Sequence, residues 1–241
     1  YMNIELGRDD LTSGSAWRST FAELIAVFLF VFVGAGAVVA TGQITGGTLS
    51  VDRLIAIALA HGITIAVLVA AVARVSGAHI NPAVTVATVI TGKLTFTKGL
   101  LYIGAQLVGA ALGAFLLDAV VIGESNLGAH ALSAAISGST TGLIVEIGLT
   151  FFLVFVIFAT AIDPRGPGHL APFAIGMTVL VNHFIGVPLT GASMNPARSF
   201  GPALASGQWA DHWVYWAGPI IGAIVAALLY QFIFNSKEQD E

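Results

Sequence analysis

The sequence predicts an all-α membrane protein of six transmembrane helices plus two half-helices, arranged as an inverted 3+3 repeat. Three observations lead to this fold class. The 241-residue chain is 56% hydrophobic and only 9% charged, whereas soluble domains carry about a quarter charged residues. Six apolar segments have the length of roughly 20 residues that a bilayer crossing needs. Two further apolar segments, each introduced by Asn-Pro-Ala, are only about half as long.

The six predicted spans are apolar stretches separated by turn-forming residues. They cover residues 17–40, 54–75, 98–122, 142–162, 170–186 and 212–234. Glycine, proline and polar residues interrupt the apolar sequence at 41–47, 163–168 and 186–191. We treat the whole chain, 1–241, as a single transmembrane domain, with a first repeat at about 17–122 and a second at about 141–234.

An internal repeat supports this division into two halves. The stretch 22–32, which contains Glu23, resembles the stretch 145–155, which contains Glu146. Each half holds three spans, an odd number, so the two halves must cross the membrane in opposite orientations. The half-helices then enter from opposite sides, and their N-termini meet near the membrane midplane.

The distribution of lysine and arginine predicts the orientation of the chain. Seven of these side chains fall on one set of alternate loops, while Arg53 and Arg198 fall on the other. The seven are Arg8, Arg18, Arg74, Lys93, Lys98, Arg165 and Lys237. Because cytoplasmic loops carry the excess of positive charge, we expect an integral, multi-pass membrane protein with both termini in the cytoplasm.

An Asn-Pro pair predicts where each half-helix begins. Asparagine is a good N-cap, and proline suits the first helical position because its missing N–H would be unpaired there anyway. The two motifs are Asn81-Pro82-Ala83 and Asn195-Pro196-Ala197. The apolar runs 83–92 and 197–206 are too short to span a bilayer, so each must be buried in protein or line a watery cavity.

Two facing helix N-termini would favour water over cations, because each end carries partial positive charge. If each Asn oxygen caps its own helix, the amide N–H groups of Asn81 and Asn195 are left to point into the cavity. A water molecule that accepts from both must direct its own hydrogens along the pore, which interrupts proton transfer. The simpler interpretation is that the asparagines only cap helices, but their matched positions in the repeat favour the functional one.

With their flanking residues, the two motifs resemble the major intrinsic proteins, the aquaporins, over essentially the whole chain. The matching stretches are SGAHINPAVT at 76–85 and TGASMNPARSFG at 190–201, together with Ala22-Glu23 in the first span. The resemblance implies an aquaporin-like fold in which the chain forms one channel domain. It also implies a homotetramer with one pore per subunit.

A narrow aromatic/arginine filter on the outer side of the pore is a further implication of the resemblance. The spacing from the two Asn-Pro-Ala motifs assigns the four filter positions to His61, His183, Ala192 and Arg198. A buried arginine is costly in a membrane and usually functional, whereas a lone histidine in an apolar helix is more often a core residue. His61 together with Ala192 resembles the vacuolar plant aquaporins, some of which also pass ammonia, while His183 resembles the water-specific members.

Four other residues receive candidate roles. His79 precedes Asn81 and is expected in the cytoplasmic vestibule, and His130 either reaches the outer mouth or is a solvated loop histidine. Glu23 and Glu146 are intramembrane acids, for which a proton relay is one hypothesis. We favour a structural role, in which both carboxylates accept hydrogen bonds from the irregular backbone before each half-helix.

These features predict a passive water-selective transmembrane channel that excludes protons and ions, and not an enzyme. The expected partners are water, the lipid bilayer and further copies in a homotetramer, with ammonia left open and nucleic acid excluded. No cofactor or metal is indicated, and cysteine is absent. The alternatives are a broader neutral-solute channel that also passes ammonia, hydrogen peroxide or glycerol, and a proton-coupled transporter that uses Glu23 and Glu146.

Overall fold

The computed structural model describes residues 4–122 and 126–234, and every regular element within them is a helix. The long helices are α1 Gly14–Ile44, α2 Val51–Ser76, α4 Phe96–Val120, α5 Ser139–Ile157, α6 Ala171–Gly186 and α8 Val214–Leu229. The half-helices are α3 Pro82–Ile90 and α7 Pro196–Ser206. The short elements are the 3-10 helices η1 Arg8–Leu11 and η3 Gly168–Leu170 and the π-helices η2 Phe158–Ile162 and η4 Tyr230–Phe234.

Within residues 4–122 and 126–234, six helical segments are long and apolar enough to cross a membrane, once η2, η3 and η4 are joined to α5, α6 and α8. This confirms the predicted fold class. Some boundaries differ from the prediction. α1 continues to Ile44 because no proline interrupts it, and the chain turns only where Gly46 and Gly47 take positive φ angles of 59° and 83°. α4 begins early, at Phe96, because Thr95 Oγ1 caps it by accepting from the Lys98 N–H at 3.3 Å.

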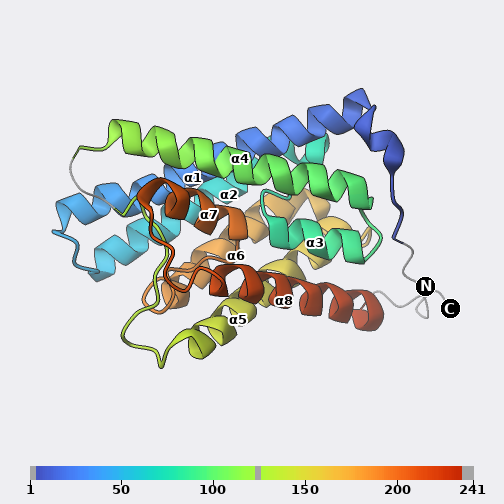
Figure 1. The fold of residues 1–241 in the computed structure, drawn as a ribbon. Helices are drawn as coiled ribbons and strands as arrows, with labels where there is room; N and C mark the ends of the chain where they lie inside the picture. Colours follow the sequence, from blue (N-terminus) through green and yellow to red (C-terminus); the bar gives the residue numbers. More distant parts are fainter. Residues whose placement is uncertain (1–3, 123–125, 235–241) are drawn as a thin grey trace.

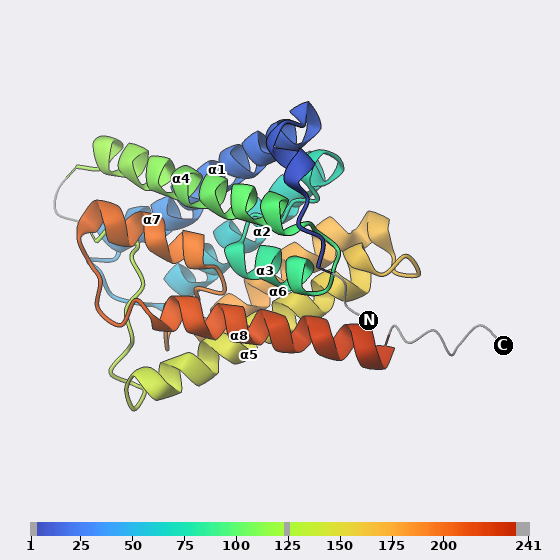
Figure 2. The same ribbon diagram turned by 45° about the vertical axis from the view of Figure 1, so that its right-hand side comes forward.

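The two halves of the chain repeat one packing pattern, which Figures 1 and 2 show from two directions. α1 packs against α2 and α4, just as α5 packs against α6 and α8, and α2 meets α6 between the halves. Each half-helix packs against the last long helix of the other half, α3 on α8 and α7 on α4. This exchange brings the two half-helix N-termini together inside the molecule.

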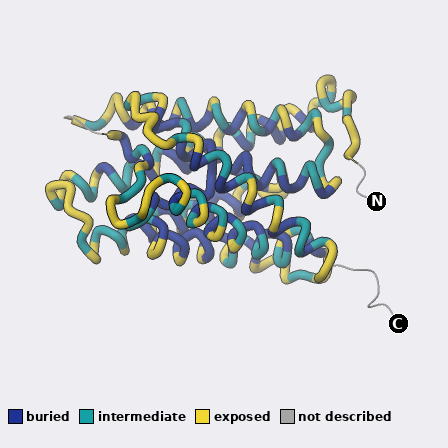
Figure 3. The backbone as a smooth tube through the Cα atoms, turned by 60° about the horizontal axis from the view of Figure 1, so that its bottom comes forward, coloured by how far each residue is buried: buried dark blue, intermediate teal, exposed yellow. Residues whose placement is uncertain are grey.

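Glycines allow the long helices of each half to approach closely. A Cβ atom at Gly109 of α4 would lie 2.3 Å from the carbonyl oxygen of Leu24 in α1. A Cβ atom at Gly222 of α8 would lie 2.3 Å from that of Ile147 in α5. Small residues commonly permit such contacts between membrane helices. Figure 3 shows the buried positions running through the interior, with exposed positions along the outside.

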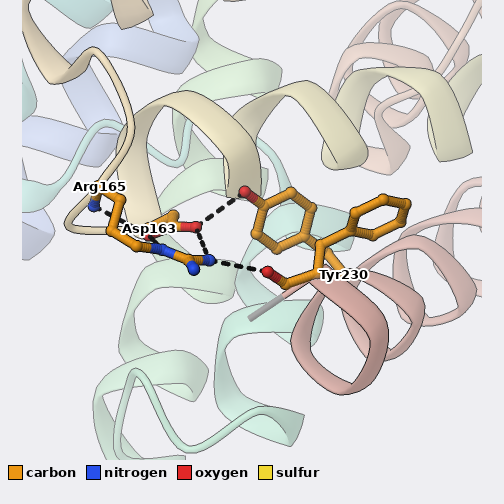
Figure 4. A network of polar contacts seen from close by, with 4 residues as sticks. Asp163, Arg165 and Tyr230 are labelled. Atoms are coloured by element: carbon orange, nitrogen blue, oxygen red, sulfur yellow. Dashed lines mark hydrogen bonds and ion pairs between the residues drawn. The ribbon is translucent and has the colours of Figure 1, made fainter. Parts of the chain in front are cut away.

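One end of the molecule carries both the start of α1 and the end of η4 (Figure 1). A polar network there ties the α5–α6 connection to η4 (Figure 4). Arg165 pairs with Asp163 at 2.7 Å and also donates to the carbonyl oxygen of Phe234 at 2.7 Å, while the Tyr230 hydroxyl donates to Asp163 at 2.9 Å. Lys237, which contributed to the predicted orientation, lies outside the described residues.

Candidate functional site

The junction of the two half-helices forms the centre of the site. Asn81 Oδ1 accepts from the N–H of Ala83 at 2.8 Å and so caps α3, while Asn195 Oδ1 accepts from the N–H groups of Ala197 and Arg198 and so caps α7. Each side-chain amide also reaches across the junction. Asn81 Nδ2 donates to the carbonyl oxygen of Met194 at 2.7 Å, and Asn195 Nδ2 donates to that of Ile80 at 2.8 Å.

These crossed bonds refine the expected geometry of the two amides. A primary amide has two N–H donors. One donor of each asparagine is used to fasten the opposite loop, so the other remains for the cavity that Asn81 and Asn195 both line. The two motifs therefore hold each other in place as well as capping their own helices.

The loops that lead into the half-helices have an unusual backbone. Ala78, Ile80, Ala192 and Met194 all have φ between 52° and 63°, in the left-handed region that side chains other than glycine seldom occupy. Such strain persists only where the surroundings hold the backbone in place. The repetition of the pattern in both loops follows the internal repeat of the sequence.

Glu23 and Glu146 supply that support from within the helix bundle. Glu23 accepts from the backbone N–H groups of His79 at 2.9 Å and Ile80 at 2.6 Å. Glu146 accepts from those of Ser193 at 2.9 Å and Met194 at 2.8 Å. Both carboxylates are fully buried. Because each acid is held by several donors of a strained loop, this geometry favours a structural role over a proton relay.

A cavity of about 330 Å³ passes the junction. It is lined by Lys93, between α3 and α4, by Gly168, at the start of η3, and by both asparagines. Beyond them it reaches His61, His183, Ala192 and Arg198. The structure thus brings all four residues of the expected filter to one part of one cavity.

The side chains of His61 and His183 face each other at this point, with ring centroids 4.3 Å apart and an interplanar angle of 33°. Arg198 Nε donates to His61 Nε2 at 3.3 Å. Arg198 is only 2% exposed, and no carboxylate of residues 4–122 or 126–234 forms an ion pair with it. A buried positive charge without a counter-ion repels cations from the space beside it.

Backbone carbonyls determine the hydrogen positions on both rings. His61 Nδ1 lies 2.9 Å from the carbonyl oxygen of Ile57, and His183 Nδ1 lies 2.7 Å from that of Val179. A carbonyl can only accept, so each Nδ1 carries a proton. In the neutral ring Nε2 is then an acceptor. Arg198 occupies this acceptor on His61, whereas Nε2 of His183 has no partner among the described residues.

His130 lies beside this cluster, on the loop between α4 and α5. It is 8% exposed, and its Nδ1 lies 2.8 Å from the hydroxyl of Ser199, the residue after Arg198. Burial, followed by the charge of Arg198, lowers the pKa of His130 well below its usual value. The alternative of a solvated loop histidine does not fit this environment. His130 is not among the residues that line the cavity, so it contacts the cluster from the side that faces away from the cavity.

His79 lines the cavity on the other side of the junction, where its Nδ1 lies 3.0 Å from the hydroxyl of Thr85. The structure also reveals two contributors that the sequence analysis missed. The carbonyl oxygen of Gly128 accepts from Arg198 at 2.9 Å, and Gln106 donates to both Glu23 and Thr85. No sequence signal marks the Gly128 carbonyl, because every residue type has one. In the described ranges, no group of three or more His, Asp or Glu side chains is placed to hold a metal ion.

Comparison with known proteins agrees with this architecture. Residues 10–230 match the family model described as Major intrinsic protein. The chain is 48% identical over 222 residues to a protein named Aquaporin TIP4-4 from Zea mays, covering 91% of this chain and 88% of that protein. It is 43% identical to Probable aquaporin TIP3-2 from Arabidopsis thaliana, covering 93% and 86%.

A solved structure shares the fold at lower sequence identity. It is the X-ray structure of the aquaglyceroporin from Plasmodium falciparum, which superposes with a TM-score of 0.78 at 24% identity and covers 91% of this chain and 97% of that one. Together with the six membrane-crossing segments, the matched family model and relatives lead to one conclusion. The chain is an integral, multi-pass membrane protein that belongs to the major intrinsic protein family.

Proposed function

We propose that the protein is a passive channel that conducts water in single file and excludes protons and ions. The observation that carries this proposal is the pair Asn81 and Asn195, which cap facing half-helices and line the same cavity. Water that passes the pair meets an N–H donor from each side. Family membership and relatives named as aquaporins support water as the permeant.

In this proposal, His61, His183, Ala192 and Arg198 form the selectivity filter. The free acceptor of His183 and the donors of Arg198 replace the hydrogen bonds that a water molecule gives up on entering the constriction. The charge of Arg198 adds to the partial positive charge of the half-helix N-termini, so cations are opposed at two levels of the pore. His79 belongs to the cytoplasmic vestibule, and His130 stabilises the outer mouth through Ser199.

The remaining parts of the proposal concern assembly and orientation. Both termini lie in the cytoplasm, and four copies assemble into a homotetramer in the lipid bilayer, each with its own pore. The name of the aquaglyceroporin from Plasmodium falciparum does not extend glycerol transport to this chain, because below 25% identity the likeness concerns the fold. Since Glu23 and Glu146 are engaged by backbone donors, proton-coupled transport is not favoured.

Stopped-flow measurements on proteoliposomes test the proposal directly. We expect rapid water efflux under an osmotic gradient, no acidification of the lumen under a proton gradient, and slow reswelling with glycerol. Parallel assays with ammonia and hydrogen peroxide distinguish a water-selective channel from a broader neutral-solute channel. Gradient-driven accumulation of a solute would contradict a passive channel, and absence of water flux from folded protein would contradict the proposal as a whole.

A filter variant tests the four assigned residues. The double substitution His61→Ala with Arg198→Val should widen the constriction and admit glycerol while water still passes. His169→Ala is the matched control, because His169 is an exposed histidine of η3 that does not line the cavity. Unchanged selectivity in the double variant would reject the filter assignment but leave the water-channel proposal standing.

A further inference from the structure

A glycine of α1 lies directly behind the filter histidine of α2. Gly34 is buried, and a Cβ atom built on it would lie 2.8 Å from both Cδ2 and Nε2 of His61. Real Cβ atoms essentially never come closer than 3.0 Å to a heavy atom outside their own local backbone. The imidazole of His61 therefore occupies the space into which any side chain at position 34 would extend.

The ring of His61 is held on its other sides as well. Phe30, one helical turn before Gly34, presents its ring to His61 at 5.8 Å between centroids with an interplanar angle of 86°. Nδ1 is bonded to Ile57, and Nε2 accepts from Arg198. α1 blocks movement of the His61 ring on one side, and the contacts with Ile57 and Arg198 hold the edge of the ring. A displaced ring would therefore move into the cavity, toward His183.

We propose that Gly34 is a positioning residue, which sets the width of the constriction by letting His61 lie back against α1. Because Gly34 has no side chain, the surface of α1 has a recess that accommodates the His61 ring, and the ring of Phe30 lies at the bottom of this recess. This inference rests on the proposed function, because it assigns Gly34 a role through His61 at the filter. Gly34 itself does not line the cavity.

Gly34 differs from the glycines that only bring helices together. At Gly109 and Gly113 of α4, the atoms nearest to an added Cβ belong to the backbone of α1. At Gly34, the three nearest atoms all belong to the His61 ring. A methyl group at position 34 would therefore press on the filter side chain before it pressed on the neighbouring helix.

Gly34→Ala is the direct test, and Gly36→Ala is its matched control on the same helix. A Cβ atom at Gly36 would meet only Leu117 Cδ1, at an ordinary contact distance of 3.5 Å. In stopped-flow assays normalised to folded protein, we expect Gly34→Ala to lower water permeability about tenfold, because a displaced ring obstructs a single-file pore. Gly36→Ala should conduct like the wild type.

A double variant separates an effect on the filter from general damage to the fold. His61→Ala removes the ring that the new methyl group would displace, so Gly34→Ala combined with His61→Ala should conduct water as well as His61→Ala alone. Wild-type permeability in Gly34→Ala would overturn the inference. So would a double variant as impaired as Gly34→Ala, because the defect would then lie in helix packing. A wild-type protein that conducts no water would instead overturn the proposed function.

Discussion

The buried acids illustrate how a single side chain can stabilise an irregular loop in a membrane. Glu146 Oε1 accepts from Thr190 at 2.6 Å and from the Ser193 N–H, while Oε2 accepts from the Met194 N–H. In the bilayer interior no bulk water is present to replace these acceptors. The loop before α7 keeps its left-handed residues Ala192 and Met194 because one carboxylate satisfies two consecutive N–H groups.

Replacing this acid by its amide should weaken the loop without changing its size. In Glu146→Gln, one acceptor oxygen becomes an N–H₂ donor that faces a backbone N–H, and a buried unsatisfied group costs about 1–3 kcal/mol. We expect a lower thermal unfolding midpoint in detergent and reduced water flux. Asp118→Asn, an exposed acid on α4, is the control and should match the wild type. Equal stability of the two variants would refute the structural role of Glu146.

At the scale of the helices, close packing depends on where side chains are missing. α4 can pack against α1 because Gly109 and Gly113 leave room for the backbone carbonyl oxygens of Leu24 and Phe28. Gly104, on the same helix, has no heavy atom within 4 Å of its ideal Cβ position apart from its own helix backbone and its chain neighbours. Glycines at the two kinds of position should therefore respond differently to the same substitution.

Gly109→Ala should destabilise the protein by about 1–3 kcal/mol, because a backbone carbonyl cannot move aside as a side chain would. Gly104→Ala should be neutral or slightly stabilising, since alanine favours the helical state more than glycine does. Thermal unfolding monitored by tryptophan fluorescence would compare the two variants. A larger loss in Gly104→Ala than in Gly109→Ala would contradict the observed α1–α4 packing.

The network between the α5–α6 connection and η4 predicts a specific pH dependence. Hydrogen bonds from Arg165, chiefly from its side chain, hold the pKa of Asp163 well below its ordinary value of 3.8. The stabilisation is thus complete above pH 3.8 and declines as pH falls toward the folded-state pKa. Asp163→Asn should lower the unfolding midpoint by an amount that stays constant from pH 7 to about 4.

Tyr230→Phe provides the comparison for this network, because it removes one donor and leaves the Asp163–Arg165 ion pair in place. Its effect should be smaller than that of Asp163→Asn at every pH. If the Asp163→Asn effect already faded between pH 6 and 5, Asp163 would titrate there, and the strong interaction with Arg165 would be refuted.

At the scale of the whole molecule, the inverted repeat places alternate connections at opposite ends. The α1–α2 connection lies at one end, and the α5–α6 connection lies at the other, near the start of α1 (Figure 2). The chain contains no cysteine, so a single introduced cysteine reports its own location. Thr48 and His169 are exposed positions in these two connections.

Membrane-impermeant maleimide applied to intact cells should label Thr48→Cys and spare His169→Cys, because the charge distribution predicts that the termini lie in the cytoplasm. Permeabilised cells should label both variants, which shows that each site is reactive. The reverse pattern in intact cells would establish the opposite orientation, with the His61–Arg198 cluster facing the cytoplasm.

Local patterns were sufficient to predict much of this molecule. Apolar length predicted the six spans, and Asn followed by Pro predicted the caps of α3 and α7, because capping and membrane insertion depend on residues close together in the chain. The repeat around Glu23 and Glu146 predicted the inverted arrangement. Family resemblance, rather than any physical pattern, singled out His61 and His183 among the apolar helices.

Only the tertiary structure revealed contacts between segments far apart in sequence. Asn81 donates to Met194 and Asn195 to Ile80 because the half-helices are exchanged between the halves. The carbonyl of Gly128 and the recess at Gly34 carry no sequence signal, since one is common to all residues and the other is an absence. Residues close together in the chain were thus enough to predict which segments enter the membrane and where the two half-helices begin. The shape of the pore and the hydrogen-bond donors that line it depend on how helices from both halves pack against one another.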